Sequence, residues 1–247
     1  MTYTQIRYPL PSITWDVLPD NFILPDDPVD NNLQPLLAAA LRESLELAGL
    51  IQESHIVATN FGLCATVEGR TIVKAPDWVW IRETLPIPEG KIRRSYSPRA
   101  EGAVPTIVME FISHTDGGEY SFSPHYPYGK WYFYEQILQI PIYVIFHPSS
   151  GVLELYCLGT EGYQKQTADA NNRYWIEEIG LYLGVWWGKR MEMTANWLRW
   201  WDRSGNLLWW GKELAEQLTT ELEQERNSKQ LLANKLRELG IDPTQLS

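Results

Sequence analysis

The sequence predicts an α/β protein with a mixed central sheet, flanking helices and a helical tail at the C-terminus. Two apolar segments, residues 104–113 and 141–148, have the composition of strands buried on both faces. Between them, residues 129–140 place four apolar side chains on one stripe of a helix: Trp131, Tyr134, Ile137 and Leu138. A strand, a helix and a strand in this order form a βαβ unit with parallel strands. Residues 212–239 are helix-forming throughout and contain no proline, which predicts the tail.

Ahead of this unit the sequence predicts an extended segment followed by a helix. Residues 1–30 are rich in proline and acidic residues, which predicts little regular structure. From Asn32 onward, apolar residues recur at helical spacing: Leu33, Leu36, Leu37, Ala40, Leu41, Leu45 and Ala48. We expect Asp30 or Asn31 to cap the start of this amphipathic helix and Gly49 to end it.

Strand-like segments follow the helix. Residues 55–67 alternate loosely between apolar and polar side chains, and a turn is expected at Gly69. Pro76 interrupts the next apolar run, because proline cannot donate a ladder hydrogen bond. Residues 77–81 are therefore predicted to form a strand of their own, with Asp77 at its beginning.

The region after the βαβ unit is predicted to form antiparallel strands. Residues 152–159 pair with the preceding strand as a hairpin, and residues 163–210 form strand pairs around Gly188 and around the turn at 202–206. Two thin hairpins cannot bury seven tryptophans, so some should pack on the main body or on a second subunit. These are Trp186, Trp187, Trp197, Trp200, Trp201, Trp209 and Trp210.

We expect three parts in the chain: an extended segment at 1–30, a domain with the sheet and the Trp-rich hairpins at 31–210, and a helix or tail at 211–247. Leucines form a stripe along the last part: Leu214, Leu218, Leu222, Leu232, Leu236 and Leu239. Glu221 and Glu225 interrupt a strict heptad pattern, which favours a solvated helix. A two-stranded coiled coil is the alternative.

The charge balance limits the kind of partner. The net charge of −10 disfavours a large nucleic-acid footprint, because the field of the protein repels phosphates. One basic loop, residues 90–102, departs from this balance. Its basic residues are Lys91, Arg93, Arg94 and Arg99. The loop is either a solvated surface or a phosphate contact.

A cytoplasmic protein without a membrane span is expected. The chain begins without a secretory signal and contains no run of eighteen apolar residues. Cys64 and Cys157 lie in apolar, strand-like contexts, which is typical of buried thiols in the cytosol. Their number and spacing predict neither a disulfide nor a zinc motif.

The candidate chemistry centres on a glutamate inside a predicted strand. Glu110 occupies a core position of residues 104–113, where a carboxylate needs a cation, a metal or a proton beside it. Asp77 and Glu110 can together hold Mg²⁺, which needs only one or two carboxylates. Lys130 can orient or deprotonate a metal-bound water and stabilise charge on a phosphorane. In purely structural terms, Asp77 could instead cap a turn and Lys130 could lie on the surface over Tyr134.

Several short motifs occur in one order along the chain: Pro76-Asp77 before a strand, Glu110-Phe111-Ile112-Ser113 in the next strand and Lys130-x-x-x-Tyr134 in the helix. Together with the N-terminal helix, the LRWWD-x-x-GN segment and the final GIDP, they make the sequence similar to the Uma-type family of predicted restriction endonucleases. The similarity is to a branch abundant in cyanobacteria. That family belongs to the PD-(D/E)xK nuclease superfamily, so the resemblance implies a restriction-endonuclease-like core.

The resemblance also implies a metal-dependent enzyme that hydrolyses DNA phosphodiester bonds. Asp77 and Glu110 match the metal-binding carboxylates of the family, for Mg²⁺ or alternatively Mn²⁺. Lys130 matches the catalytic lysine, which in the superfamily usually stands two residues after the acid. Ile112 occupies that place here, so the lysine has moved to the following helix.

Further residues are expected to support this site. Ser113, Tyr134 and Gln136 are predicted to hold the three catalytic side chains in place, and the loop before the helix contains two acids, Asp116 and Glu119. DNA and a second copy of the chain are the expected partners, because such enzymes often dimerise to cut both strands. Two other functions stay open: an inactive nuclease-fold module for binding or regulation, and an oligomeric interaction protein that uses the C-terminal helix.

Overall fold

The computed structural model describes residues 12–17, 32–112 and 118–239. The chain divides into two compact units at the junction between Leu208 and Trp209. The first unit contains the three β-sheets and the shorter helices, and the second contains one long helix. Several expected features lie outside the described residues: the predicted extended segment 1–30 except residues 12–17, the supporting residue Ser113, the loop acid Asp116 and the capping residues Asp30 and Asn31.

The central sheet has six strands, and its pairing is mixed, which confirms the predicted mixed sheet. The strand order is β10-β9-β8-β7-β5-β2. The strand bounds are β2 (Ile56–Ala58), β5 (Trp78–Ile81), β7 (Ile107–Phe111), β8 (Ile142–His147), β9 (Val152–Gly159) and β10 (Gly162–Lys165). Only β7 and β8 pair in parallel in this sheet, with Glu110 opposite Ile145, and the other pairs are antiparallel. The predicted βαβ unit and the hairpin after it are therefore confirmed.

The connection between β7 and β8 is helical but not a regular α-helix. It consists of α2 (Lys130–Tyr132) and a π-helical segment, η1 (Phe133–Leu138). Gln139 ends the segment in a left-handed conformation, with φ at 59°. The sequence predicted one amphipathic helix here, and its apolar face is buried except for Trp131, which is half-buried. π-helical turns are rare and occur frequently at functional sites.

A second sheet contains β1 (Ile13–Thr14), β3 (Gly62–Val67), β4 (Arg70–Lys74) and β6 (Ser95–Tyr96). Residues 55–67, expected as one strand-like run, divide into β2 and β3 in different sheets. The chain bends between them at Asn60, which has φ at 49°. The turn predicted at Gly69 joins β3 and β4. Both of its central residues, Glu68 and Gly69, have positive φ, as a two-residue hairpin turn of type I′ requires.

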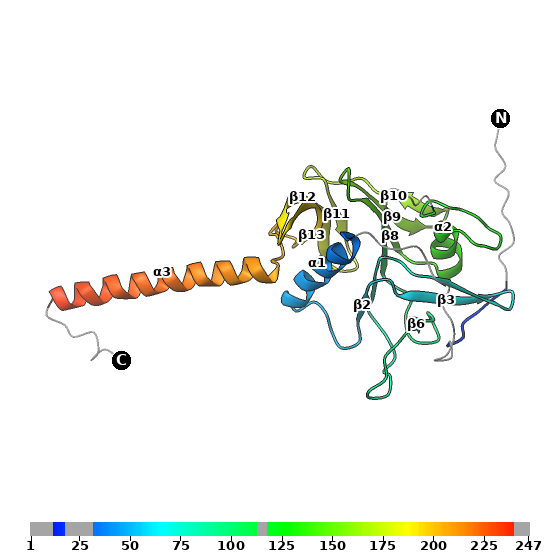
Figure 1. The fold of residues 1–247 in the computed structure, drawn as a ribbon, viewed down its shortest axis with the longest axis horizontal. Helices are drawn as coiled ribbons and strands as arrows, with labels where there is room; N and C mark the ends of the chain where they lie inside the picture. The colour runs from blue at the N-terminus through cyan, green and yellow to red at the C-terminus, as the bar shows by residue number, and fades with distance from the viewer. Residues whose placement is uncertain (1–11, 18–31, 113–117, 240–247) are drawn as a thin grey trace. The chain divides into compact units, whose positions relative to one another are not determined.

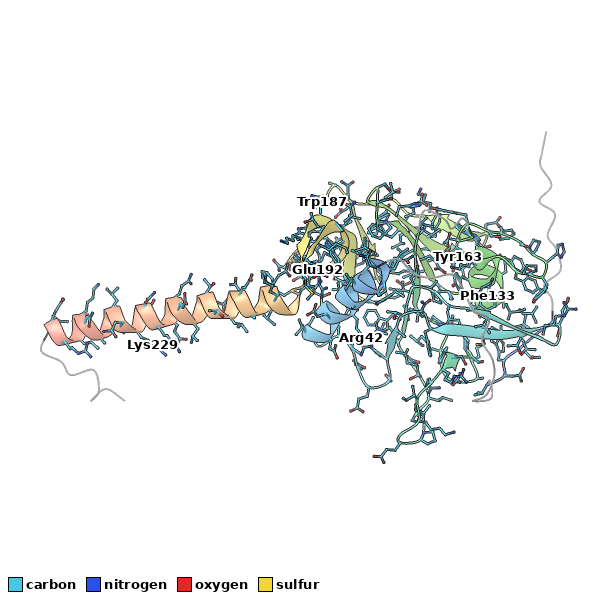
Figure 2. All side chains as sticks on the ribbon, in the orientation of Figure 1. Arg42, Phe133, Tyr163, Trp187, Glu192 and Lys229 are labelled. Atoms are coloured by element: carbon cyan, nitrogen blue, oxygen red, sulfur yellow. The ribbon has the colours of Figure 1, made fainter. Side chains whose placement is uncertain are left out.

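The third sheet contains β11 (Arg173–Ile176), β12 (Leu181–Arg190) and β13 (Met193–Trp201). Helix α1 (Gln34–Leu47) packs against β13 (Figure 1). Trp200 joins the layers, because its indole N–H donates to Leu41 O at 3.2 Å and its ring lies 6.0 Å from that of Trp78. Some of the tryptophans do pack on the main body, as predicted. Trp187, in the second half of β12, remains 65% exposed (Figure 2).

The ends of α1 follow from the local sequence. Leu33 precedes the first helical turn and provides no side-chain cap, and Pro35 occupies that turn, where a missing N–H costs nothing. Gly49 follows the last turn with φ at 68°, so the predicted end of the helix is confirmed.

The second unit contains α3 (Gly211–Glu238), which confirms the predicted C-terminal helix. The Glu213 carboxylate accepts a hydrogen bond from the backbone N–H of Trp210 at 2.9 Å. Lys235 and Arg237 lie in the last turn, where positive charges interact favourably with the helix dipole. No described residue of α3 is buried, and its side chains project on all sides (Figure 2). None of the described helices combines the length and apolarity needed to cross a bilayer.

Candidate active site

Two adjacent strands bring Asp77 close to the end of β7. Asp77 directly precedes β5, which pairs antiparallel with β7 so that Trp78 lies opposite Met109. The Asp77 carboxylate accepts a hydrogen bond from the backbone N–H of Phe111. This contact fixes Asp77 against the residue that follows Glu110. The alternative from the sequence, in which Asp77 only caps a turn, is therefore incomplete, because the Asp77 carboxylate also binds the neighbouring strand β7.

Glu110 is buried in the centre of the sheet and has two polar partners. The residue is 1% exposed. Its Oε2 accepts a hydrogen bond from Lys130 Nζ at 3.2 Å, and its Oε1 accepts one from the Tyr134 hydroxyl at 2.8 Å. The sequence required a cation, a metal or a proton beside this carboxylate. In the structure the adjacent cation is the ammonium of Lys130.

Lys130 begins α2 and points inward to the carboxylates. Besides Glu110, it forms an ion pair with Glu119 Oε1 at 3.6 Å. Its position depends on Gly129, since a Cβ atom there would lie 1.9 Å from the backbone oxygen of Ser121. Lys130 is therefore not a surface side chain lying over Tyr134.

Glu119, one of the two acids noted in the loop before the helix, belongs to this cluster, although the sequence assigned it no role. It is 4% exposed, and its Oε2 has no hydrogen-bond partner among the residues described. Its backbone oxygen accepts a hydrogen bond from the Tyr143 hydroxyl at 2.9 Å. The available signal was weak: an acid in an aromatic loop that leads to Lys130.

The charges of the cluster act on one another. Burial raises the pKa of Glu110 above its usual value, although the charge of Lys130 and the hydrogen bond from Tyr134 oppose this effect. Burial by itself lowers the pKa of Lys130, but the charges of Glu110, Glu119 and Asp77 outweigh it, so this pKa is raised. Lys130 is therefore an ammonium at neutral pH, suited to donating hydrogen bonds and stabilising negative charge.

The remaining predicted supporting residues lie in different surroundings. Tyr134 is fully buried and holds Glu110. Gln136 directs its side-chain hydrogen bond to Glu135 Oε2, at 2.8 Å. Glu135 is itself buried and accepts the backbone N–H of Tyr163, so this pair braces the π-helical segment against β10.

The cluster offers oxygen donors only, the ligand type that Mg²⁺ and Mn²⁺ prefer. Among the described residues, no three His, Cys, Asp or Glu side chains are arranged to hold a metal ion. Glu119 Oε2 is nevertheless a buried carboxylate oxygen without a donor, the kind of atom that a cation would satisfy. The oxygen atoms thus suit a hard divalent cation by type, whereas the positions of the described side chains do not form a three-ligand site.

Two arginines of the basic loop have structural partners. Arg93 pairs with Glu101, and both side chains are largely buried. Arg99 lies over the ring of Trp15 and donates to Gln139 at 2.9 Å. Lys91 remains exposed. Arg93 and Arg99 therefore stabilise the local structure of this loop through partners within the protein, which does not favour the alternative of a phosphate contact for these two side chains.

The sequence was compared with known families and proteins. A search of curated proteins found no match. The model of the Uma2 family, described as "Putative restriction endonuclease", matches residues 14–194. This stretch includes Asp77, Glu110, Glu119 and Lys130 and ends before α3. Because the match covers well over half of the sequence, the chain belongs to the Uma2 family.

Proposed function

We propose that this protein is a metal-dependent endonuclease that hydrolyses DNA phosphodiester bonds, with Mg²⁺ as the cofactor and Mn²⁺ as a substitute. The observation that carries the proposal is the buried Glu110 carboxylate, held between Lys130 and Tyr134. Asp77 is bound to the next residue of the same strand. Membership of a family named for restriction endonucleases supports the same reaction.

Each residue has one role in the proposed reaction. Asp77 and Glu110 hold the metal, which when bound polarises the phosphoryl group and lowers the pKa of water. Lys130 is an ammonium, so it orients the attacking water and stabilises the negative charge of the phosphorane instead of removing a proton. Tyr134 keeps the Glu110 carboxylate in one orientation through its 2.8 Å hydrogen bond.

The test is cleavage of supercoiled plasmid and of linear DNA by the purified 247-residue chain, with Mg²⁺, with Mn²⁺ and with EDTA. We expect metal-dependent cleavage that falls at least about 100-fold in Asp77→Asn, Glu110→Gln and Lys130→Met. Glu135→Gln is the matched control, because Glu135 is a buried acid of the neighbouring helical segment with its own partners. Cleavage by Glu110→Gln at the wild-type rate would exclude this site.

An inactive nuclease-fold module is the second candidate function. It is favoured by the absence, among the described residues, of three ligands arranged around one point, and by the net charge of −10. Titration calorimetry with Mn²⁺, followed by a DNA-binding assay, separates the two. Binding of DNA without metal uptake or cleavage would support the module.

A homodimer located in the cytoplasm completes the proposal. Two copies would allow both DNA strands to be cut, and α3 carries exposed leucines that could join them. Cys64 and Cys157 are free thiols, which agrees with a reducing compartment.

A further inference from the structure

The loop that leads into α2, residues 118–129, exposes several aromatic rings, and we call it the aromatic loop. Three of its side chains are exposed: Tyr120 at 42%, Phe122 at 51% and Tyr126 at 63%. Among the described residues outside this loop, only Trp187 and Trp209 are aromatic and exposed. Large rings usually bury their faces in a core or an interface. Their concentration on one loop therefore indicates a surface that binds another molecule.

Two of the rings are held from behind by other aromatic side chains. Tyr120 stacks on Trp131, with ring centroids 6.3 Å apart, and its hydroxyl donates to Glu154. Phe122 meets Tyr132 edge to face, with centroids 5.3 Å apart. Because these contacts already restrict the rings, a flat ligand that stacks on them costs little further conformational entropy.

The rings extend from the central sheet to the second sheet. The Tyr120 hydroxyl lies 3.2 Å from His147 Nε2, at the end of β8. Tyr126 lies beneath the guanidinium of the exposed Arg70, the first residue of β4, which is 5.4 Å from the ring centre. Aromatic rings accompanied by an arginine are the combination on which the bases of single-stranded nucleic acids stack.

The aromatic loop also runs beside Lys130. The Gly129 N–H donates to Ser123 O at 3.1 Å, and a Cβ atom on Gly129 would lie 1.9 Å from Ser121 O. Phe122, between these two serines, is therefore fixed next to the residue that precedes Lys130. A nucleotide whose base stacks on Phe122 would bring its phosphate into the neighbourhood of the Lys130 ammonium.

The net charge of the chain bears on which form of DNA suits this surface. At −10, it disfavours binding that depends on many phosphate contacts. Stacking on aromatic rings needs few such contacts, but it requires bases whose faces are accessible. The faces are accessible in a single strand and covered by neighbouring bases in a duplex. The combination of aromatic rings and negative charge therefore favours unpaired DNA.

We propose that the aromatic loop binds the bases of single-stranded DNA and presents that strand to Lys130, so that unpaired DNA is the preferred substrate. The inference rests on the proposed function for the kind of polymer and for the role of Lys130. It concerns base stacking, which needs neither a metal nor cleavage and can be measured without them.

The experiment measures DNA binding by fluorescence anisotropy, with the 247-residue chain in EDTA. The probe is an end-labelled single strand of about 12 nucleotides, close to the length that one stacking surface covers. We expect it to bind at least about 10-fold more tightly than a duplex of the same length. A strand with abasic sites in place of the bases keeps every phosphate, and it should also bind at least about 10-fold more weakly than the intact single strand.

Substitutions in the aromatic loop locate the contact. Phe122→Ala and Tyr126→Ala should each weaken single-strand binding at least about 5-fold, because each removes one stacking ring, whereas Phe122→Trp should retain it. Trp187→Ala is the matched control, since Trp187 is an exposed aromatic residue of β12. Its affinity should stay within about two-fold of wild type, because no base stacks there. Circular dichroism confirms that each variant is folded.

Two results would overturn the inference and leave the proposed function intact wherever metal-dependent cleavage is observed. The first is equal affinity for the single strand, the duplex and the abasic strand, since binding would then depend on phosphates alone. This comparison uses only wild-type protein, so it decides even where a variant does not fold. The second is wild-type affinity in both Phe122→Ala and Tyr126→Ala.

Two further results separate the inference from the proposed reaction. Base-dependent binding without cleavage under any metal condition supports the inference and removes the endonuclease activity. No binding to any of the three DNA probes overturns the inference, and the exposed rings would then belong to an interface with another protein.

Discussion

At the scale of single residues, the buried carboxylates of Glu110 and Glu119 share one cation. Among the described residues, the Lys130 ammonium is the one positive charge shown to contact them. Charges taken out of water are tolerated only when paired and hydrogen-bonded. Glu110 meets this requirement with two donors, whereas Glu119 meets it only through the ion pair. The stability of the metal-free protein should therefore depend strongly on this lysine.

Lys130→Met should lower the free energy of unfolding by about 3 kcal/mol, the cost of leaving buried acids without their cation. The measurement is urea denaturation of the metal-free protein at pH 7. Lys165→Met is the control, because Lys165 is an exposed partner of Glu154 and its loss should cost under about 1 kcal/mol. Equal denaturation midpoints for the two variants would contradict the assigned burial of the cluster.

Glu154 offers a pH-dependent prediction at the same scale. Burial by itself raises the pKa of this carboxyl, but hydrogen bonds from Lys165, Tyr120 and Tyr156 outweigh burial and leave the pKa below its usual value. A depressed folded-state pKa stabilises the protein above the unfolded pKa, and this contribution is lost as pH falls through the folded value.

Glu154→Gln should therefore cost at most about 1 kcal/mol at pH 7 and progressively less below about pH 4. Urea denaturation of wild type and variant at pH 7, 5 and 3.5 checks the trend. A difference between the two proteins that stays constant with pH would show that the charge of Glu154 is not what its partners stabilise.

At the scale of elements, the sequence predicted the strands better than the connection between them. β7 and β8 were recognisable because their apolar runs are continuous. The π-helical geometry of residues 133–138 was not predictable, since it depends on tertiary contacts such as the Tyr163 N–H bond to Glu135. The division of residues 55–67 between two sheets depends likewise on the turn at Asn60, a conformation that local pattern does not reveal.

The candidate site shows the same limit. Asp77, Glu110 and Lys130 could be proposed from the sequence, because a charged residue in an apolar strand requires a partner and the motif order matches a family. Glu119 could not be placed, because the return of the 118–129 loop depends on Gly129 lying against Ser121, a contact between backbones. Ser113 stays a prediction, as it lies outside the described residues.

This contact leads to a prediction for the loop. Gly129→Ala should lower the free energy of unfolding by about 1–3 kcal/mol, because the added methyl would push the backbone of Ser121 and displace the loop. Gly118→Ala is the matched control at the other end of the loop. Nothing lies within 4 Å of its added Cβ, so its effect should stay within about 0.5 kcal/mol. Equal effects of the two substitutions, measured by urea denaturation, would show that the close approach of Gly129 to Ser121 is unimportant for stability.

At the scale of the whole molecule, the unit that contains the Glu110–Lys130 cluster and the C-terminal helix differ in kind. The family match ends at residue 194, and the cluster lies entirely in the first compact unit. The boundaries 1–30, 31–210 and 211–247 stay predictions, as does the homodimer. α3 exposes four leucines, Leu218, Leu222, Leu231 and Leu232, and Leu239 directly after the helix is exposed as well. Leu218 and Leu222 lie one turn apart and therefore on the same face of the helix.

We expect the full-length chain to be dimeric in solution, with pairing through the Leu218–Leu222 face of α3. Leu218→Glu/Leu222→Glu should shift the mass measured by light scattering from about twice the 28.6 kDa of one chain to a single chain, because like charges would face each other across the seam. Thr220→Glu/Gln224→Glu adds the same charges at the same spacing on the opposite face, and it should remain dimeric. A monomeric wild type at tens of micromolar would exclude the dimer. A dimer that neither double variant disrupts would place the interface on the first unit instead. There, Trp187 is the largest exposed side chain of the β12–β13 hairpin.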